Sequence, residues 1–158
     1  MRFYLIDKVT ELVPGERAHG VKAVTLTDEV LHDHFPGYPV LPGALVVESM
    51  AQLAGFLLDM TFNRGEAPLR RALLVQIKQA NFHEPCEPGD RLEVEATIAS
   101  TLEDAAQVQA EVRVGEKRAA RALLTFAMKA IPVESVHEQR RAVYRLWTRH
   151  FDPPLDIR

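Results

Sequence analysis

The chain has 158 residues, of which 47% are hydrophobic and 26% charged, and its formal net charge is −3. This length and composition predict one globular domain that is long enough to bury a core, and the net charge gives no sign of nucleic-acid binding. A single cysteine, Cys86, excludes an intramolecular disulfide framework and any CxxC metal or redox motif.

The first part of the chain predicts a β-hairpin. Residues 3–12 are rich in β-branched and apolar side chains, and residues 18–26 alternate apolar and polar over their second half. The Val-Pro-Gly sequence of residues 13–15 between them is a turn signal. The charged residues Asp7 and Lys8 follow the first apolar residues directly, so we expect no signal peptide and a cytoplasmic location.

A loop rich in proline and glycine follows the hairpin. Five of the eight residues from 36 to 43 are proline or glycine, which excludes a helix or a central strand there. Pro42 has a preset φ that suits the first turn of a helix, and it lacks an N–H that would have no partner at that position. We therefore expect a helix to begin near Pro42 or Gly43.

The run from residue 44 to residue 60 is apolar on almost every side of the helix that it predicts. A helix of that kind is buried in the core of a protein or spans a membrane. At about 17 residues the run is nearly long enough to span a bilayer, but Glu48 and Gln52 in its middle argue against a membrane span. The pattern indicates the central helix of a folded core.

Glu48 is the unusual residue of this helix, because a carboxylate in an apolar setting is costly to ionise and is rarely left without a partner. Gln52 lies four residues further on, so both side chains project from the same face. Something polar must meet that face, and His34 in the preceding loop is the nearest candidate in the sequence.

The rest of the chain predicts four more strands and a second helix. Proline residues make residues 82–90 irregular, which indicates a sheet edge or a bulge. The pattern as a whole predicts an α+β fold in which the central helix packs against one face of an antiparallel sheet. The expected strands are a buried strand at residues 72–77, alternating strands at residues 91–100 and 106–114, and a last strand that returns at residues 118–129.

Residues 135–151 predict the second helix, with a capping box at Ser135 and Glu138. We expect the domain boundary near residue 131, with residues 132–158 as a C-terminal helical extension. One interpretation is a packing helix whose basic face is merely solvated, and the other is a docking surface for an acidic partner. The basic residues concerned are Arg140, Arg141, Arg145 and Arg149.

The loop and the helix together resemble the β-hydroxyacyl-acyl-carrier-protein dehydratases of the FabZ and FabA type. That family has a His-Phe-Pro-Gly loop, a Pro-Gly pair before a helix, and an acidic residue in the helix. Here these features are residues 34–37, residues 42–43 and Glu48, the last followed by Gln52. The resemblance covers roughly residues 3–130 and is far more specific than any one short motif.

The resemblance implies the hot-dog fold, an antiparallel sheet wrapped around a long central helix. It implies a hydro-lyase of fatty acid biosynthesis, or of related polyene or polyketide biosynthesis, that removes water from a (3R)-hydroxyacyl thioester on acyl carrier protein. The product is a trans-2-enoyl thioester, and no cofactor or metal is expected. The resemblance also implies a homodimer, or a higher oligomer built from dimers, in which His34 and Glu48 meet across the interface.

Each candidate residue has an expected role in such a reaction. His34 is the base, because an imidazole exchanges protons near neutral pH. Gly43 is expected to offer a backbone N–H at the helix N-terminus to the thioester oxyanion. Glu48 is expected to act on the 3-hydroxyl, as acid or as the group that orients the departing water, and Gln52 to hold its carboxyl. The expected lining of the acyl tunnel is Leu41, Leu45 and Phe82.

The chain departs from the family pattern at three places. Asp33 stands where the family usually has a glycine before the histidine, and the short N-terminal helix of the family is missing or reduced. Residues 81–84 also lack the arginines that the family often places before its Pro-Gly-Asp sequence. Carrier docking is therefore assigned, as a hypothesis, to the arginines of the C-terminal helix.

Other functions remain open from the sequence. A hot-dog thioesterase would use Glu48 beside an activated water, although the His-Phe-Pro-Gly loop favours dehydration. A non-catalytic subunit that binds a carrier or forms dimers would keep only the fold. His32 and His34 would make an alternating metal pair, but the sequence offers no further obvious ligand.

Overall fold

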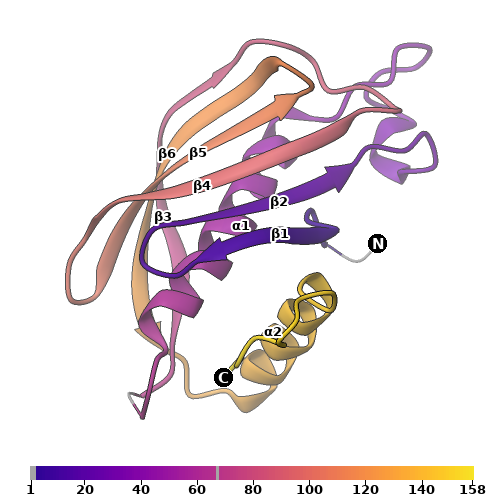
Figure 1. Ribbon diagram of the computed structural model, residues 1–158. Helices are drawn as coiled ribbons and strands as arrows, with labels where there is room; N and C mark the ends of the chain where they lie inside the picture. The colour runs from indigo at the N-terminus through magenta and orange to yellow at the C-terminus, as the bar shows by residue number, and fades with distance from the viewer. Residues whose placement is uncertain (1–2, 67) are drawn as a thin grey trace.

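The computed structural model describes residues 3–66 and 68–158 of the chain. In this part of the chain six strands form one sheet, and two α-helices and one short 3-10 helix accompany it (Figure 1). The elements in order are β1 (Lys8–Val13), β2 (Arg17–Ala23), η1 (Glu29–Leu31), α1 (Gly43–Phe62), β3 (Arg70–Phe82), β4 (Arg91–Thr101), β5 (Ala105–Val114), β6 (Lys117–Ala130) and α2 (Glu134–Trp147).

The sheet has the strand order β1-β2-β4-β5-β6-β3, and every neighbouring pair is antiparallel. The sheet curves around α1, which lies along its concave face (Figure 1). The α+β hot-dog arrangement that the sequence predicts is thus confirmed. The first strand is shorter than expected, because the backbone N–H of Leu5 donates to the Gln52 side chain at 2.9 Å rather than to a neighbouring strand.

The start of α1 at Gly43, with Pro42 as its N-cap, confirms the prediction from the Pro-Gly pair. The backbone N–H groups of Leu45 and Val46 both donate to the Pro42 carbonyl, at 2.8 and 3.1 Å. This helix is long and apolar enough to cross a membrane, but 67% of its most apolar stretch is buried by the rest of the fold. That degree of burial is typical of a core helix.

The second helix, α2, covers the side of α1 that the sheet leaves open and lies next to β1 (Figure 1). The Tyr144 and Trp147 rings lie 4.9 and 6.3 Å from the Phe56 ring of α1, centroid to centroid, and both contact it edge-on. The predicted capping box is wrong: the helix begins at Glu134, and its N-cap residue Val133 makes no side-chain cap hydrogen bond. The division of the chain near residue 131 stays a prediction.

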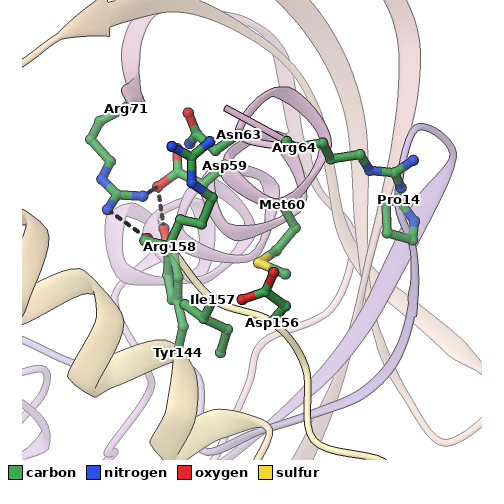
Figure 2. A pocket seen from close by; sticks show the side chains of 11 residues that line it. Pro14, Asp59, Met60, Asn63, Arg64, Arg71, Tyr144, Asp156, Ile157 and Arg158 are labelled. Atoms are coloured by element: carbon green, nitrogen blue, oxygen red, sulfur yellow. Dashed lines mark hydrogen bonds and ion pairs between the residues drawn. The ribbon is translucent and has the colours of Figure 1, made fainter. Parts of the chain in front are cut away.

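A buried polar cluster joins α2 to α1 and β3 (Figure 2), and the sequence gives no local sign of it. Asp59 is 3% exposed and forms an ion pair with Arg71 at 3.3 Å. It also accepts hydrogen bonds from the Tyr144 hydroxyl at 2.8 Å and the Ala72 N–H at 2.9 Å. Burial raises the pKa of Asp59, and the Ala72 N–H, Arg71 and the Tyr144 hydroxyl each act to lower it.

The edge strand β3 corrects one prediction. The sequence predicts a buried strand at residues 72–77, but most of β3 is exposed in the single chain. Val75 is 60% and Ile77 49% exposed, and Phe82 at the strand's end is 54% exposed. An apolar run shows that a strand is to be covered, but it does not show whether the cover comes from the same chain. An exposed apolar edge strand has unpaired backbone groups and is therefore a ready template for pairing with another chain.

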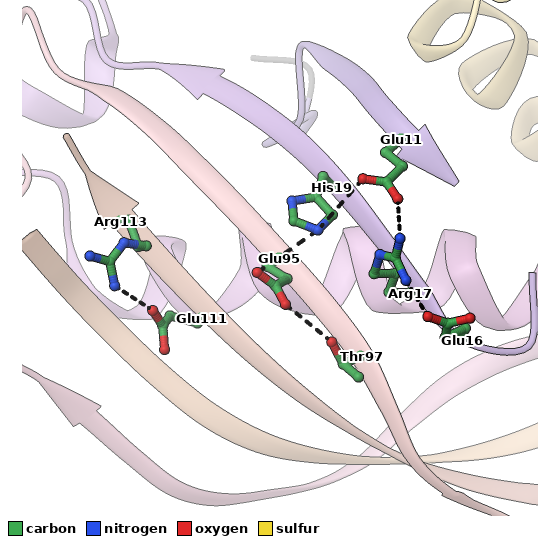
Figure 3. Close-up of polar contacts among 8 residues, drawn as sticks. All are labelled: Glu11, Glu16, Arg17, His19, Glu95, Thr97, Glu111 and Arg113. Carbon is green, nitrogen blue, oxygen red and sulfur yellow. Dashed lines mark hydrogen bonds and ion pairs between the residues drawn. The ribbon is translucent and has the colours of Figure 1, made fainter. Parts of the chain in front are cut away.

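The outer face of the sheet is polar (Figure 3). Arg17 donates to Glu11 at 2.7 Å, and the His19 ring lies 3.9 Å from Glu11 and 3.8 Å from Glu95. All four side chains are more than one-third exposed, so these pairs add little stability. This face is the solvated side that strand alternation predicts, and the core lies between the other face and α1.

Replacing Tyr144 with phenylalanine tests the buried cluster. Burial raises the pKa of Tyr144 well above its usual value, so the hydroxyl keeps its proton and donates to Asp59. Removing that donor leaves a buried carboxylate with one fewer partner, which should lower the free energy of unfolding by about 1.5–3 kcal/mol. Urea denaturation measures the change. Tyr38→Phe, at a residue that is 58% exposed, should have almost no effect, and an equal loss in both variants would contradict the assignment.

Candidate active site

His34 lies in the loop between η1 and α1, and backbone hydrogen bonds hold this loop in place. The Val40 N–H donates to the His34 carbonyl at 2.8 Å, which closes the loop on itself. The Leu41 N–H donates to the Cys86 carbonyl, also at 2.8 Å, which ties the loop to the segment after β3. Gly37 has φ of 75°, a conformation that glycine adopts at no steric cost.

The His34 ring has a defined tautomer. Its Nδ1 lies 2.8 Å from the Val40 carbonyl oxygen, and a carbonyl can only accept, so Nδ1 must carry the proton. In the neutral ring the other nitrogen, Nε2, then has a free lone pair. The side chain is half-buried and stacks on the Phe35 ring with centroids 4.1 Å apart. The ring is therefore oriented to accept a proton at Nε2.

His34 opens on a cavity of about 280 Å³, which we call the His34 cavity. Three other predicted site residues, Leu41, Gly43 and Phe82, line it as well. A Cβ added at Gly43 would lie 3.0 Å from the Phe82 ring, so any larger residue would push this ring away from the start of α1. The Gly43 N–H belongs to the first turn of the helix, where backbone N–H groups have no partner within the helix.

Glu48 and Gln52 lie on a different face of α1. The Gln52 side-chain amide donates to the Glu48 carboxylate at 3.0 Å and to the Phe3 carbonyl at 3.1 Å. The Gln52 side-chain oxygen accepts the Leu5 N–H at 2.9 Å, which fixes the amide's orientation. The hydrogen bond that the sequence leads us to expect between Gln52 and Glu48 is therefore present. It holds one carboxylate oxygen, and no side chain of residues 3–66 or 68–158 donates to the other.

A second cavity of about 350 Å³ lies beside Glu48, and we call it the Glu48 cavity. From α1 it is lined by Glu48, Gln52 and Gly55, and from β3 by residues 72–74. Phe3, Tyr4 and Phe126 add to the lining, and a further wall comes from α2, which is the feature that sequence reasoning missed most clearly. Arg140 belongs to that wall rather than to a surface shared with the other arginines of the helix.

The two cavities lie on roughly opposite faces of α1. At about 3.6 residues per turn, Gly43 and Val46 point to one side, whereas Glu48, Gln52 and Gly55 point to the other. Within one chain, His34 and Glu48 therefore do not share a cavity. The strand β3 passes both: its start lines the Glu48 cavity, and Phe82 at its end lines the His34 cavity.

The other predicted residues have mixed placements. Leu45 is partly buried against the core and lines neither cavity. Arg141 donates to Glu134 at 2.6 Å, Arg149 donates to the Leu146 carbonyl, and Arg145 is exposed. Within residues 3–66 and 68–158, no three His, Cys, Asp or Glu side chains lie close enough to hold a metal ion, so the proposed metal pair of His32 and His34 gains no third ligand.

Comparison with known proteins places this geometry in a family. Residues 1–123 match the family model described as FabA-like domain. The 3-hydroxyacyl-[acyl-carrier-protein] dehydratase FabZ of Desulforamulus reducens is 39% identical over 127 residues, which are 80% of this chain and 87% of that protein. FabZ of Clostridioides difficile is 34% identical over 127 residues, which again are 80% of this chain and 87% of that protein. The Streptococcus mutans protein smu.793, solved with acetyl CoA, has a TM-score of 0.62 at 17% identity, covering 78% of this chain and 88% of that one.

Cys86 also lines the His34 cavity, and its chemistry gives a direct prediction. The residue is 2% exposed, and burial, with a smaller contribution from Asp90, raises the pKa of its thiol to about 11. Only the thiolate reacts with disulfide reagents, so native protein at pH 8 should react with Ellman's reagent at least tenfold more slowly than the same protein in urea. Equal rates in the two states would show that Cys86 is reactive in the folded site.

Proposed function

The chain belongs to the FabA-like family, and on that basis we propose that it is a 3-hydroxyacyl-[acyl-carrier-protein] dehydratase. The reaction removes water from a 3-hydroxyacyl thioester and yields a trans-2-enoyl thioester. The observation that carries the proposal is the His34 ring, whose Nδ1–H the Val40 carbonyl accepts, so that Nε2 is the nitrogen left for substrate at the His34 cavity.

His34 begins the reaction. Its Nε2 takes a proton from C2 of the substrate, and the C–H electron pair moves toward the thioester carbonyl, whose oxygen becomes negative. The ring then carries protons on both nitrogens, and the Val40 carbonyl continues to accept from Nδ1. General bases placed in this way typically contribute about 10²–10⁴ to the rate.

The start of α1 stabilises the oxyanion. The Gly43 N–H has no partner within the helix, and the helix dipole favours negative charge at this end. The Phe82 ring lies against Gly43 where a Cβ would stand, so this ring and the helix start together line the His34 cavity. Such preorganised donors supply their stabilisation where charge develops in the transition state.

Glu48 completes the elimination. Its carboxyl group gives a proton to the 3-hydroxyl, the C3–O bond breaks, and water leaves as the C2=C3 double bond forms. Gln52 keeps one carboxyl oxygen in place through its 3.0 Å hydrogen bond, so the other oxygen is directed at the substrate. Proton exchange with solvent afterwards restores neutral His34 and protonated Glu48.

The active site lies between two copies of the chain in this proposal. The exposed apolar strand β3 supports this arrangement, because pairing with a second β3 would cover it. If two such strands pair antiparallel about Ile77, then Phe82 of one protomer lies beside Ala72 of its partner, since each is five residues from Ile77. The His34 cavity of one protomer then meets the Glu48 cavity of the other. Full activity in a species that sediments as a monomer would exclude this arrangement.

The carrier protein that the enzyme uses and its cellular location belong to the same proposal. We propose a cytoplasmic enzyme whose acidic carrier protein docks on the exposed basic side of α2 and the turn after it. Arg141, Arg145 and Arg149 lie on that side, whereas Arg140 lines the Glu48 cavity. If charge reversal at these three arginines leaves activity on carrier-bound substrate unchanged, the docking assignment is wrong.

The direct test is to incubate the protein with a 3-hydroxyacyl thioester of acyl carrier protein. We expect the enoyl absorbance to rise with no release of free thiol, whereas a thioesterase would release thiol and a non-catalytic subunit would do neither.

His34→Ala and Glu48→Gln should each lower kcat by about 10²–10⁴, because each removes a proton-transfer group. His32→Ala, at an exposed residue that lines neither cavity, should keep wild-type kcat. Wild-type rates in His34→Ala or Glu48→Gln would remove that residue from the mechanism.

A further inference from the structure

The helix α2 forms one wall of the Glu48 cavity. Val136, Arg140 and Val143 line it there, together with the rings of Tyr144 and Trp147. The family match ends at residue 123, so this wall is built from a part of the chain that lies outside the match. The cavity that contains the proposed acid is thus closed by an element outside the matched domain.

The polar cluster of the core fixes this wall in position. Arg71 of β3 donates through Nε to His137 Nδ1 at 3.1 Å, and His137 Nε2 bonds the Ile131 carbonyl at 2.8 Å. Two helical turns after His137, the Tyr144 hydroxyl donates a hydrogen bond to Asp59 and holds the helix there as well. The wall is therefore attached at both ends of its inner face.

Arg140 lies between these two attachments on the same stripe of the helix. His137, Arg140 and Tyr144 are three and four residues apart, so all three side chains point toward the core. Arg140 is half-buried, and it makes no hydrogen bond or ion pair with any residue in 3–66 or 68–158. Its positive charge nevertheless acts on Asp59, where it is one of the influences that lower the pKa of that carboxyl.

The surroundings of Arg140 indicate what it can bind. The buried carboxylate on which its charge acts, Asp59, is already paired with Arg71, and most of the cavity wall is apolar. A guanidinium has five N–H donors in a fixed plane and loses part of its hydration when half-buried, so it favours an oxygen acceptor, and a carboxylate most of all. Glu48 is the acidic side chain among the described cavity-lining residues, and it bonds Gln52 and forms no ion pair with Arg140.

We propose that α2 is a specificity element of this site, and that Arg140 binds a carboxylate carried at the far end of the acyl chain. The inference rests on the proposed function for the identity of the substrate as an acyl thioester. Glu48 acts at C3, so the chain beyond C3 enters the cavity that α2 closes. The enzyme should then prefer an acyl group with a distal carboxylate over a plain chain of equal length.

The test measures binding, so that it does not depend on turnover. The probes are unreactive thioether analogues of acyl-pantetheine, with plain chains from butyryl to decanoyl and the matching chains that end in a carboxylate. Isothermal titration should show that, at the best length, the carboxylated probe binds at least tenfold more tightly than the plain one. Arg140→Leu should abolish this preference, and Arg140→Lys should keep part of it. Arg91→Leu, at an exposed arginine of β4 that lines neither cavity, should keep all of it.

The outcomes separate this inference from the proposed function. No preference in the wild-type protein, or a preference that survives Arg140→Leu in a folded variant, would overturn the role of Arg140. If Arg140→Leu does not fold, as judged by its Tm, Arg140→Gln replaces it in the same comparison. If the binding preference depends on Arg140 but the protein dehydrates no 3-hydroxyacyl thioester, then the role of Arg140 in binding is supported and the proposed reaction is wrong.

Discussion

The fold depends on covering a single helix that is apolar on most of its surface. The sheet covers α1 on one side and α2 covers another, through the contacts of Phe56 with Tyr144 and Trp147. Burial of these large side chains is the main stabilising contribution, since each removes a large apolar area from water. Between these covers lies the half-buried stripe that contains Glu48 and Gln52, and its polar side chains line the Glu48 cavity.

The same constraint explains why the proposed catalytic groups are divided. A helix that is surrounded by its own chain offers two openings beside the proposed catalytic groups, one at its start, near Gly43, and one along the Glu48 stripe. These openings lie on roughly opposite faces, so one chain does not bring His34 and Glu48 together. The edge strand β3 touches both openings and exposes apolar side chains between them. A second copy paired on β3 would therefore cover apolar surface and complete the site in one step.

Local patterns predicted much of this from the sequence. The Pro-Gly pair located the start of α1, strand alternation located three strands, and the spacing of four between Glu48 and Gln52 anticipated their hydrogen bond. The predictions failed where the cause is distant in the chain. The contacts from Arg71 to His137 and from Tyr144 to Asp59 join residues 66 and 85 positions apart, so no local pattern reveals them. The exposure of β3 was missed because an apolar run does not show which chain covers it.

The most direct test of the shared site is to mix two inactive variants. Preparations of His34→Ala and Glu48→Gln, refolded together in equal amounts, should form mixed dimers that make up about half of the population. Each mixed dimer has one site with both mutations and one site with neither, so dehydratase activity should return to about a quarter of the wild-type value. If the mixture stays as inactive as its components while mass spectrometry shows mixed dimers, then His34 and Glu48 do not act together across the interface.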